Sequence, residues 1–284
     1  MPIQINNLYY TYGINTPFEY KALNDINLEI QDGDYLAIVG KTGSGKSSLI
    51  QHLNAILLPT SGTIQVNDTL ITADDAKKSF KPLRKVVGVV FQFSEYQLFE
   101  ESILKDVMFG PLNFGVSEEQ ANALAKKYLG MVNIDAEMFD KSPFHLSGGQ
   151  KRRVAIAGIL AMEPDIIVLD EPTAGLDPQG IVEIMAIINQ INKEYNKTII
   201  LVTHDMDVVY EYAKEVVLLN EGNLIYRKNV VDFFNTKDIH SYNIEKPKLL
   251  EAYEVLVDKK VDKKIDFDFL IKELEGKMKH GTTK

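Results

Sequence analysis

The chain has 284 residues, of which 45% are hydrophobic and 25% are charged, and its formal net charge is −9. This length predicts one large domain or two modest ones with a substantial core, and the composition excludes disorder as the main state. The absence of cysteine excludes disulfides and thiolate metal sites. The acidic balance gives no general attraction to nucleic acid or to anionic lipid.

The sequence shows neither an export signal nor a membrane-spanning segment. Met1 to Tyr10 lacks the basic start and apolar stretch of a secretory signal, and the longest apolar run, Val154 to Met162, has half the length of a bilayer span. We therefore expect a cytoplasmic chain that reaches a membrane only through a protein partner.

Two kinds of strand are predicted. Ile3 to Tyr12 and Leu23 to Ile30 alternate apolar and polar residues, as half-exposed antiparallel strands do. Four short, continuous apolar runs rich in β-branched residues instead favour strands that are buried on both faces of a parallel sheet. These runs are Tyr35 to Val39, Val86 to Phe91, Ile166 to Leu169 and Ile199 to Val202.

Residues suited to binding or catalysis follow each of the four apolar runs. They are Gly40 with its glycine-rich loop, then Gln92, then Asp170 with Glu171, and finally Thr203 with His204. In open α/β sheets, ligands bind beyond the carboxyl ends of the strands. We therefore expect the four strand ends to converge on one site.

Helical periodicity marks two further parts of the chain. Ser117 to Val132 has Glu and Gln in its first turn and apolar residues at helical spacing, which predicts a helical insertion between strands. Two amphipathic helices are predicted in the tail, either to cover the chain's own core or to dock on a partner. Their apolar faces comprise Leu249, Leu250, Tyr253 and Val257, after Pro247, and Phe267, Leu270, Ile271, Leu274 and Met278.

The segment from Gly40 to Ser47 fits the pattern G-x-x-x-x-G-K-[ST] between a predicted strand and the helix-like Ser48 to Ile56. Its glycines let consecutive backbone N–H groups face a phosphate at a helix N-terminus. Lys46 is expected to reach the β and γ phosphates, and the Ser47 hydroxyl to ligate Mg²⁺. The residues expected to bind ATP here are Gly40, Lys41, Thr42, Gly43, Ser44, Gly45, Lys46, Ser47 and Ser48.

Two adjacent carboxylates close the run from Ile166 to Leu169. Asp170, at the strand end, is expected to hold Mg²⁺, as phosphate-binding NTPases require. Glu171 lies beside the metal without being needed as its ligand. We therefore predict that it is the general base that polarises the attacking water.

Leu146 to Gln150 supplies a second glycine-bearing helix start. Ser147 is the expected cap, and the unpaired N–H groups and helix dipole behind it attract anions. Ser147, Gly148, Gly149 and Gln150 are therefore further candidates for contact with nucleotide. An ordinary helix cap would look the same in isolation, so this interpretation depends on the phosphate loop upstream.

Together these motifs resemble the complete set of an ATP-binding cassette (ABC) ATPase over residues 1–230. More narrowly, Phe91 to Glu100 and Val154 to Pro164 resemble the energy-coupling factor transporter ATPases, especially the second of their two paired subunits. Ser94 stands where that subgroup is expected to have proline. The motifs are Gly40 to Ser47, Gln92, Leu146 to Gln150, Ile166 to Glu171, Gly175-Leu176-Asp177 and His204.

The resemblance implies an α/β phosphate-loop NTPase. We expect a mostly parallel sheet, an antiparallel β subdomain and a helical insertion at about residues 95–160. The ATPase domain would span residues 1–230, and a helical extension would span residues 231–284. The resemblance also implies a head-to-tail dimer in which Ser147 and Gly149 of one cassette complete the phosphate site of the other.

Roles for several single residues also come from the resemblance. Gln92 would join the Mg²⁺ and water network and report on a transmembrane partner, Asp177 would lie at the dimer seam, and His204 would contact the γ phosphate. Tyr12, upstream of the phosphate loop, would stack on adenine, although other aromatic residues crowd the same region: Tyr9, Tyr10, Phe18 and Tyr20. Structural roles are expected for the remaining histidines, His52, His145, His240 and His280.

The favoured function is an ATPase subunit of a micronutrient importer, for a vitamin or a transition-metal ion, held at the cytoplasmic face of the membrane. Its expected partners are a second cassette, either a paralogue or another copy, an integral-membrane coupling subunit and a substrate-capturing membrane subunit. A cytosolic cassette ATPase acting on nucleic acid or ribosomes is the alternative. Lys46 and Ser147 are 101 positions apart, which is too few for the long coiled coil of the chromosome-maintenance members. The ribosome-acting members carry two cassettes in one chain, whereas only one is found in this sequence. A phosphate-loop kinase would leave Leu146 to Gln150 unexplained.

Overall fold

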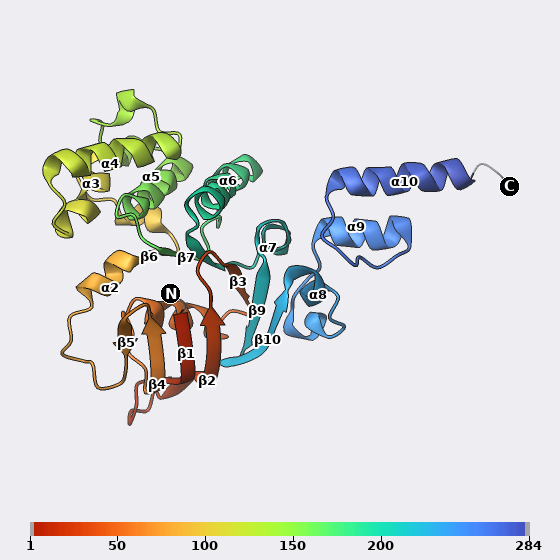
Figure 1. The fold of residues 1–284 in the computed structure, drawn as a ribbon, viewed down its shortest axis with the longest axis horizontal. Coiled ribbons are helices and arrows are strands. Elements are labelled where there is room, and N and C mark those ends of the chain that lie inside the picture. The colour runs from red at the N-terminus through yellow and green to blue at the C-terminus, as the bar shows by residue number, and fades with distance from the viewer. Residues whose placement is uncertain (1–2, 282–284) are drawn as a thin grey trace.

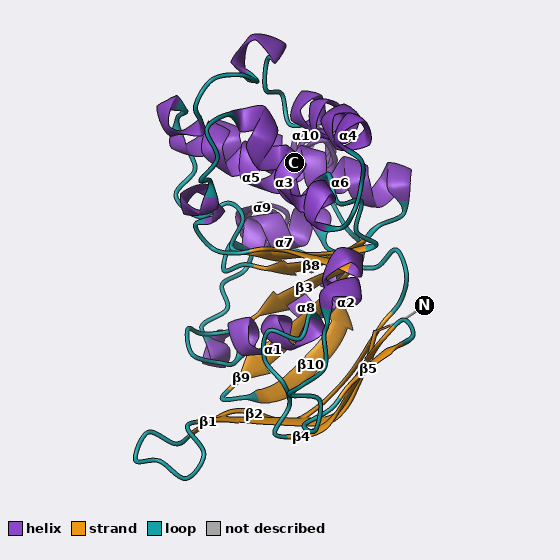
Figure 2. Ribbon diagram, turned by 90° about the vertical axis from the view of Figure 1, so that its left-hand side faces the viewer, coloured by secondary structure: helices purple, strands orange, loops and turns teal. Residues whose placement is uncertain are grey.

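The computed structural model describes residues 3–281, whose strands form two sheets. The smaller sheet has the order β2-β1-β4-β5, with antiparallel neighbours throughout. Its strands are β1 (Ile3–Tyr12), β2 (Tyr20–Ile30), β4 (Ser61–Val66) and β5 (Thr69–Ile71). The two sheets lie face to face, with the phosphate-loop helix α1 (Lys46–Leu53) between them (Figure 2).

The larger sheet has the order β10-β9-β3-β8-β7-β6. Every neighbouring pair is parallel except β10 with β9, which are antiparallel. The predicted parallel sheet and antiparallel subdomain are therefore both confirmed. The strands are β3 (Tyr35–Val39), β6 (Val87–Val90), β7 (Ile166–Asp170), β8 (Thr198–Val202), β9 (Glu215–Asn220) and β10 (Asn223–Asn229).

Most of the helices lie on the face of the larger sheet away from the antiparallel sheet (Figure 2). One group gathers at one end of the molecule, and α8, α9 and α10 extend beyond β10 at the other end (Figure 1). Besides α1, the helices are α2 (Lys81–Val86), α3 (Ile103–Asn113), α4 (Glu118–Met131), α5 (Gly148–Leu160), α6 (Pro178–Tyr195), α7 (Met206–Tyr212), α8 (Val230–Phe234), α9 (Lys248–Val257) and α10 (Phe267–Gly281). Short 3₁₀ turns cover Ser94–Gln97, Ala136–Met138, Pro143–His145 and Ile239–Tyr242.

Buried side chains form two clusters, one on each face of the larger sheet. The first packs β3, β7 and β8 against α3 to α7, and the second fills the space between the two sheets. All five residues of β3, β7 and β8 are buried, as continuous apolar runs on a central parallel strand predict. Burying both faces fixes the three strands rigidly, and with them the loops at their carboxyl ends.

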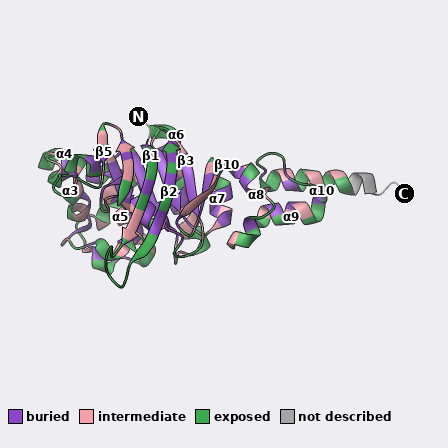
Figure 3. Ribbon diagram, turned by 90° about the horizontal axis from the view of Figure 1, so that it is seen from below, coloured by how far each residue is buried: buried purple, intermediate pink, exposed green. Residues whose placement is uncertain are grey.

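The C-terminal helices α9 and α10 contribute only part of their side chains to the first cluster. Leu250, Tyr253 and Val257 of α9 and Leu270 of α10 are buried in it. The tail nevertheless projects from the body and carries exposed as well as buried residues (Figure 3). Within residues 3–281, no helix combines the length and apolar character needed to cross a bilayer.

One predicted strand, Val86 to Phe91, needs correction at both ends. Val86 ends α2 and Phe91 follows β6, so the predicted strand is shorter at both ends. The predicted apolar face of the last helix is only partly covered, because Phe267 is 67% exposed and Ile271 is 51% exposed. The side chain of Met278, assigned to the same face, lies outside the described part of the structure.

Candidate nucleotide-binding site

The phosphate loop connects β3 to α1 and depends on glycine at particular positions. Gly40 has φ 147°, and a Cβ there would lie 2.1 Å from the carbonyl oxygen of Leu219. Gly45 has φ 103°, and its Cβ would lie 2.6 Å from the carbonyl oxygen of Ala22. Both positions need a left-handed backbone and close packing, which only glycine accommodates without strain. The sequence motif thus forms a tight loop at the N-terminus of α1.

Lys46 is held within this loop. Its Nζ donates hydrogen bonds to the carbonyl oxygens of Gly40, at 2.7 Å, and Lys41, at 2.9 Å. Burial lowers the pKa of the Lys46 ammonium below its usual value, and the charges of Glu171 and Asp170 oppose that effect. The positive charge therefore sits in a partly desolvated cradle facing two carboxylates, where an anionic phosphate interacts strongly with it.

Ser47 and Asp170 meet across the end of the sheet. The Ser47 Oγ donates a hydrogen bond to Asp170 Oδ2 at 3.2 Å, and both line one cavity of about 390 Å³ together with Gln92. Burial raises the pKa of Asp170, with an added contribution from Glu171, while the Ser47 hydrogen bond and Lys46 lower it. A hydroxyl, a carboxylate and an amide oxygen suit Mg²⁺, which is usually held by one or two carboxylates plus substrate phosphates.

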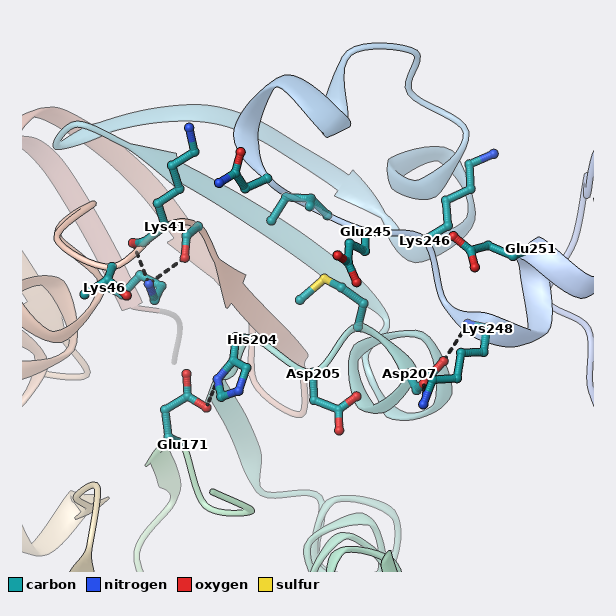
Figure 4. A pocket seen from close by; sticks show the side chains of 15 residues that line it. Lys41, Lys46, Glu171, His204, Asp205, Asp207, Glu245, Lys246, Lys248 and Glu251 are labelled. Atoms are coloured by element: carbon teal, nitrogen blue, oxygen red, sulfur yellow. Dashed lines mark hydrogen bonds and ion pairs between the residues drawn. The ribbon is translucent and has the colours of Figure 1, made fainter. Parts of the chain in front are cut away.

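Glu171 occupies a strained position directly after β7. Its φ is 51°, in the left-handed region that non-glycine residues rarely adopt, and its N–H donates to the carbonyl oxygen of Val202 at 2.9 Å. One side-chain oxygen pairs with His204 Nδ1 at 2.9 Å. The backbone conformation thus turns the carboxylate out of the strand direction and toward His204, as Figure 4 shows.

The strand ends do converge, as predicted from the residues that follow the four apolar runs. Lys46, Glu171 and His204 line both the 390 Å³ cavity and a larger one of about 920 Å³. The larger cavity runs from the phosphate loop past α7 to the segment before α9 and to the first turn of α9, where Lys248 pairs with Asp207 (Figure 4). Sequence analysis did not identify the residues of this distal wall, because no local pattern shows that the tail folds back toward the site. They are Asn243, Ile244, Glu245, Lys246, Lys248 and Glu251.

Two tyrosines contact the phosphate loop and its helix. The Tyr12 hydroxyl lies 3.1 Å from Ser48 Oγ, and the ring packs edge-on against Tyr10 with 37% of the residue exposed. Tyr20 donates a hydrogen bond to the carbonyl oxygen of Gly43 at 3.0 Å and lines the smaller cavity, unlike Tyr12. Both rings are therefore placed beside the loop, and either could present a face to a base.

The second anion-binding helix start lies in a cavity of its own. Ser147 and Gln150 form a reciprocal capping box, in which Ser147 Oγ accepts from the Gln150 N–H at 3.3 Å. Gly148 and Gly149 contribute N–H groups of the first turn, which have no partner within a helix. Asp177, whose carboxylate caps α6 through the Gly180 N–H at 2.9 Å, lines the same 440 Å³ cavity. None of the residues lining this cavity also lines either cavity at the phosphate loop.

Comparison with known proteins identifies the family. The family model described as "ABC transporter" matches residues 23–174, and a model described as "AAA domain, putative AbiEii toxin, Type IV TA system" matches residues 140–209. The chain belongs to the ABC transporter family. It hydrolyses ATP in a reaction coupled to transport.

Curated relatives narrow the assignment within the family. The chain is 56% identical to "Energy-coupling factor transporter ATP-binding protein EcfA2" of Enterococcus faecalis over 225 residues, which cover 79% of this chain and 78% of the relative. It is 50% identical to the protein of the same name from Spiroplasma kunkelii over 262 residues, covering 92% and 86% of the two chains. The predicted resemblance to this subgroup is therefore confirmed, and the chain is an ATP-binding subunit of the energy-coupling factor type.

Solved structures confirm the ABC ATPase fold. CbiO1 from Clostridium perfringens, described as part of the ABC transporter complex cbiONQ, superposes with a TM-score of 0.73 at 39% identity, covering 87% of this chain and 96% of that one. The dimeric cassette MJ0796 bound to ADP and Pi gives a TM-score of 0.72 at 30% identity, covering 80% and 98%. The first similarity extends over more of this chain.

Proposed function

We propose that the chain is one of two ATPase subunits that drive uptake of a micronutrient, either a vitamin or a transition-metal ion, through separate membrane subunits. The observation that carries the pairing of two ATPase subunits is the separation of the two helix starts predicted to bind anions. Gly45 and Lys46 begin α1 in one cavity, while Ser147 and Gly148 begin α5 in another. A second cassette, in head-to-tail orientation, would place the start of its own α5 opposite the start of α1 in this chain. Each ATP would then contact α1 of one cassette and α5 of the other.

The residues at the strand ends can divide the work of hydrolysis. Lys46 and the loop N–H groups bind the phosphates, while Ser47, Asp170 and Gln92 would hold Mg²⁺, which neutralises charge on the transferred phosphoryl group. Glu171, whose Oε2 lies 2.9 Å from Nδ1 of His204, accepts a proton from the attacking water. His204, 77% exposed, is free to reach the γ phosphate as well.

An exposed apolar face supports the proposed membrane partner. Phe93 is 48% exposed and Tyr96 is 83% exposed, on the segment that follows Gln92. Phe99 packs edge-on against Phe109 with both rings partly exposed. Exposed apolar patches of this kind mark protein contacts, and this one adjoins a residue of the proposed Mg²⁺ site. The cytoplasmic helices of an integral-membrane coupling subunit would dock here and hold the chain at the membrane surface.

The proposal is tested by purifying the tagged chain from detergent-solubilised membranes. We expect a second cassette and an integral-membrane protein to co-purify in fixed stoichiometry. We also expect the assembly to hydrolyse ATP faster than the chain alone and to support ATP-dependent uptake in vesicles. Recovery of the chain on ribosomes or nucleic acid instead would favour the alternative function, and transfer of phosphate to a metabolite would indicate a kinase.

The C-terminal extension, residues 231–284, is proposed to contact the second cassette through exposed apolar residues of α10 when ATP is absent. Phe267 and Ile271 are one helical turn apart on α10, and both are more than half exposed. Replacing both with serine should leave the unfolding temperature unchanged and weaken the nucleotide-free association of the two cassettes. Sedimentation or light scattering measures that association.

Deletion of residues 247–284 would be harder to interpret, because Leu250, Tyr253 and Val257 are part of the main core. A suitable control is Leu70→Ser, which removes a 43% exposed leucine from β5. If the double variant Phe267→Ser, Ile271→Ser associates as strongly as Leu70→Ser in the absence of nucleotide, the extension only covers the chain's own core.

A further inference from the structure

One buried guanidinium connects three separate segments around the site. Arg152, on the second turn of α5, is only 3% exposed. Its Nε donates to Glu95 Oε2 at 3.0 Å and its Nη2 donates to Glu95 Oε1 at 2.6 Å. Its Nη1 donates to the carbonyl oxygens of Pro172, at 3.2 Å, and Ala174, at 2.6 Å. Arg152 therefore bonds simultaneously to the segment after Gln92 and to the segment after Glu171.

Each of the connected segments carries a different part of the proposed mechanism. Glu95 lies on the 3₁₀ turn Ser94–Gln97, beside the exposed aromatic face. Pro172 to Ala174 lie between Glu171 and Asp177. Arg152 itself stands five residues after Ser147, the cap of the second anion-binding helix. A displacement of the 3₁₀ turn would therefore be transmitted directly to the loop behind the general base and to α5.

The geometry requires arginine and carboxylate specifically. The two parallel N–H···O bonds to Glu95 use the fork of the guanidinium, and the remaining nitrogen reaches two carbonyl oxygens on the opposite side. A lysine ammonium has no such planar fork and could not satisfy all three groups at once. Because buried ion pairs often contribute little net stability compared with apolar packing, a role in holding geometry explains this pair better than a role in stability alone.

We propose that Arg152 and Glu95 are positioning residues that couple the membrane-partner face to the catalytic loop and to the signature helix α5. This proposal deepens the proposed function and rests on it, because the aromatic face is taken as the partner's docking site. In this role the ion pair does not touch ATP. It sets the distance between the 3₁₀ turn and the loop that carries Glu171, so that partner movements reach the general base.

The link itself can be tested on the full chain without any partner. Because the chain has no cysteine, cysteines placed at the exposed positions Tyr96 and Gln179 can carry the only two spin labels. Tyr96 reports on the 3₁₀ turn, and Gln179 reports on the start of α6 behind the catalytic loop. We expect Arg152→Met to broaden the measured distance distribution between the labels.

Arg227 offers a matched control for the same substitution. Its guanidinium donates to Glu215 Oε2 at 3.1 Å from Nε and at 2.7 Å from Nη2, and its Nη1 donates to the Glu29 carbonyl. It therefore also connects three segments, but these are β10, β9 and β2. We expect Arg227→Met to leave the distance distribution unchanged. The proposal would be overturned if the distance distribution of the labelled Arg152→Met variant were as narrow as that of the labelled chain that keeps Arg152.

Coupling is tested in the assembled transporter, below the unfolding temperature of every variant. Arg152→Met and Glu95→Gln should each lower kcat for ATP hydrolysis by about 100-fold, the cost of a small misplacement of catalytic groups. They should leave the equilibrium Kd for ATP unchanged, because neither residue touches the nucleotide. Arg152→Lys should retain the positive charge and still lose most of the turnover.

Two results would overturn the coupling role. One is turnover and transport by Glu95→Gln and Arg152→Lys at the level of the unsubstituted transporter. The other is an equal loss in Arg227→Met, which would show that any three-segment bridge has the same effect. Failure of the proposed function would look different, since the unsubstituted chain would then show no stimulation by membrane subunits while the distance measurement still reports on the link.

Discussion

Glu171→Gln should abolish most ATP hydrolysis while the protein retains bound ATP. The glutamine amide keeps the size of the side chain but cannot accept a proton from water. Loss of general-base catalysis costs about 100-fold or more in rate, equivalent to about 2.7 kcal/mol of activation free energy. Phosphate release by the assembled complex measures the rate, and retention of labelled ATP on the protein measures binding.

Glu163→Gln is a control with closely similar local features. Glu163 also has a left-handed backbone, with φ 53°, and it lies just before β7 rather than just after it. It pairs with Lys127 at 3.1 Å on the surface, away from the strand ends that form the site. We expect this variant to hydrolyse ATP normally. Turnover near the unsubstituted level in Glu171→Gln would remove Glu171 from the role of general base.

The arrangement of the strand ends was predictable because each signal is local. A continuous apolar run predicts a buried strand, and parallel strands place their carboxyl ends at one edge. The phosphate loop was equally clear from its local sequence pattern, and the structure shows that a Cβ at Gly40 or Gly45 would meet backbone atoms. His52, predicted to be structural, is fully buried with a pKa lowered to about 4 by that burial.

Features that depend on distant pairs could not be predicted. Arg152 and Glu95 are 57 residues apart, and no spacing rule brings a helix and a 3₁₀ turn together. The shared cavity of Ser147 and Asp177 is similarly a product of tertiary packing. Helical periodicity placed Phe267 and Leu270 on one face of the helix. Periodicity does not show how much of that face is covered by the rest of the protein. Leu270 is buried, whereas Phe267 is largely exposed.

Lys46→Ala should cause the most severe loss of ATP binding and hydrolysis together. The ammonium is the positive charge held in the phosphate cradle by two loop carbonyls, and in its partly buried setting it attracts phosphate more strongly than an exposed lysine would. Alanine removes this charge, and loss of one preorganised donor to developing charge typically costs about 10²- to 10³-fold in rate. Isothermal titration with ATP and steady-state hydrolysis measure the two effects.

Tyr12→Ala provides the graded comparison within the same pocket. If Tyr12 stacks on adenine, its loss should raise the Kd for ATP by about 5- to 150-fold, since stacking contributes about 1 to 3 kcal/mol. The turnover at saturating ATP should change little, because a ring that stacks on the base takes no part in the transfer of the γ phosphate. Tyr20→Ala tests the neighbouring ring, whose hydroxyl bonds to Gly43. If the Kd for ATP is unchanged in Tyr12→Ala and raised in Tyr20→Ala, the stacking is assigned to Tyr20. If Lys46→Ala binds ATP with the normal Kd, Lys46 is removed from the phosphate site.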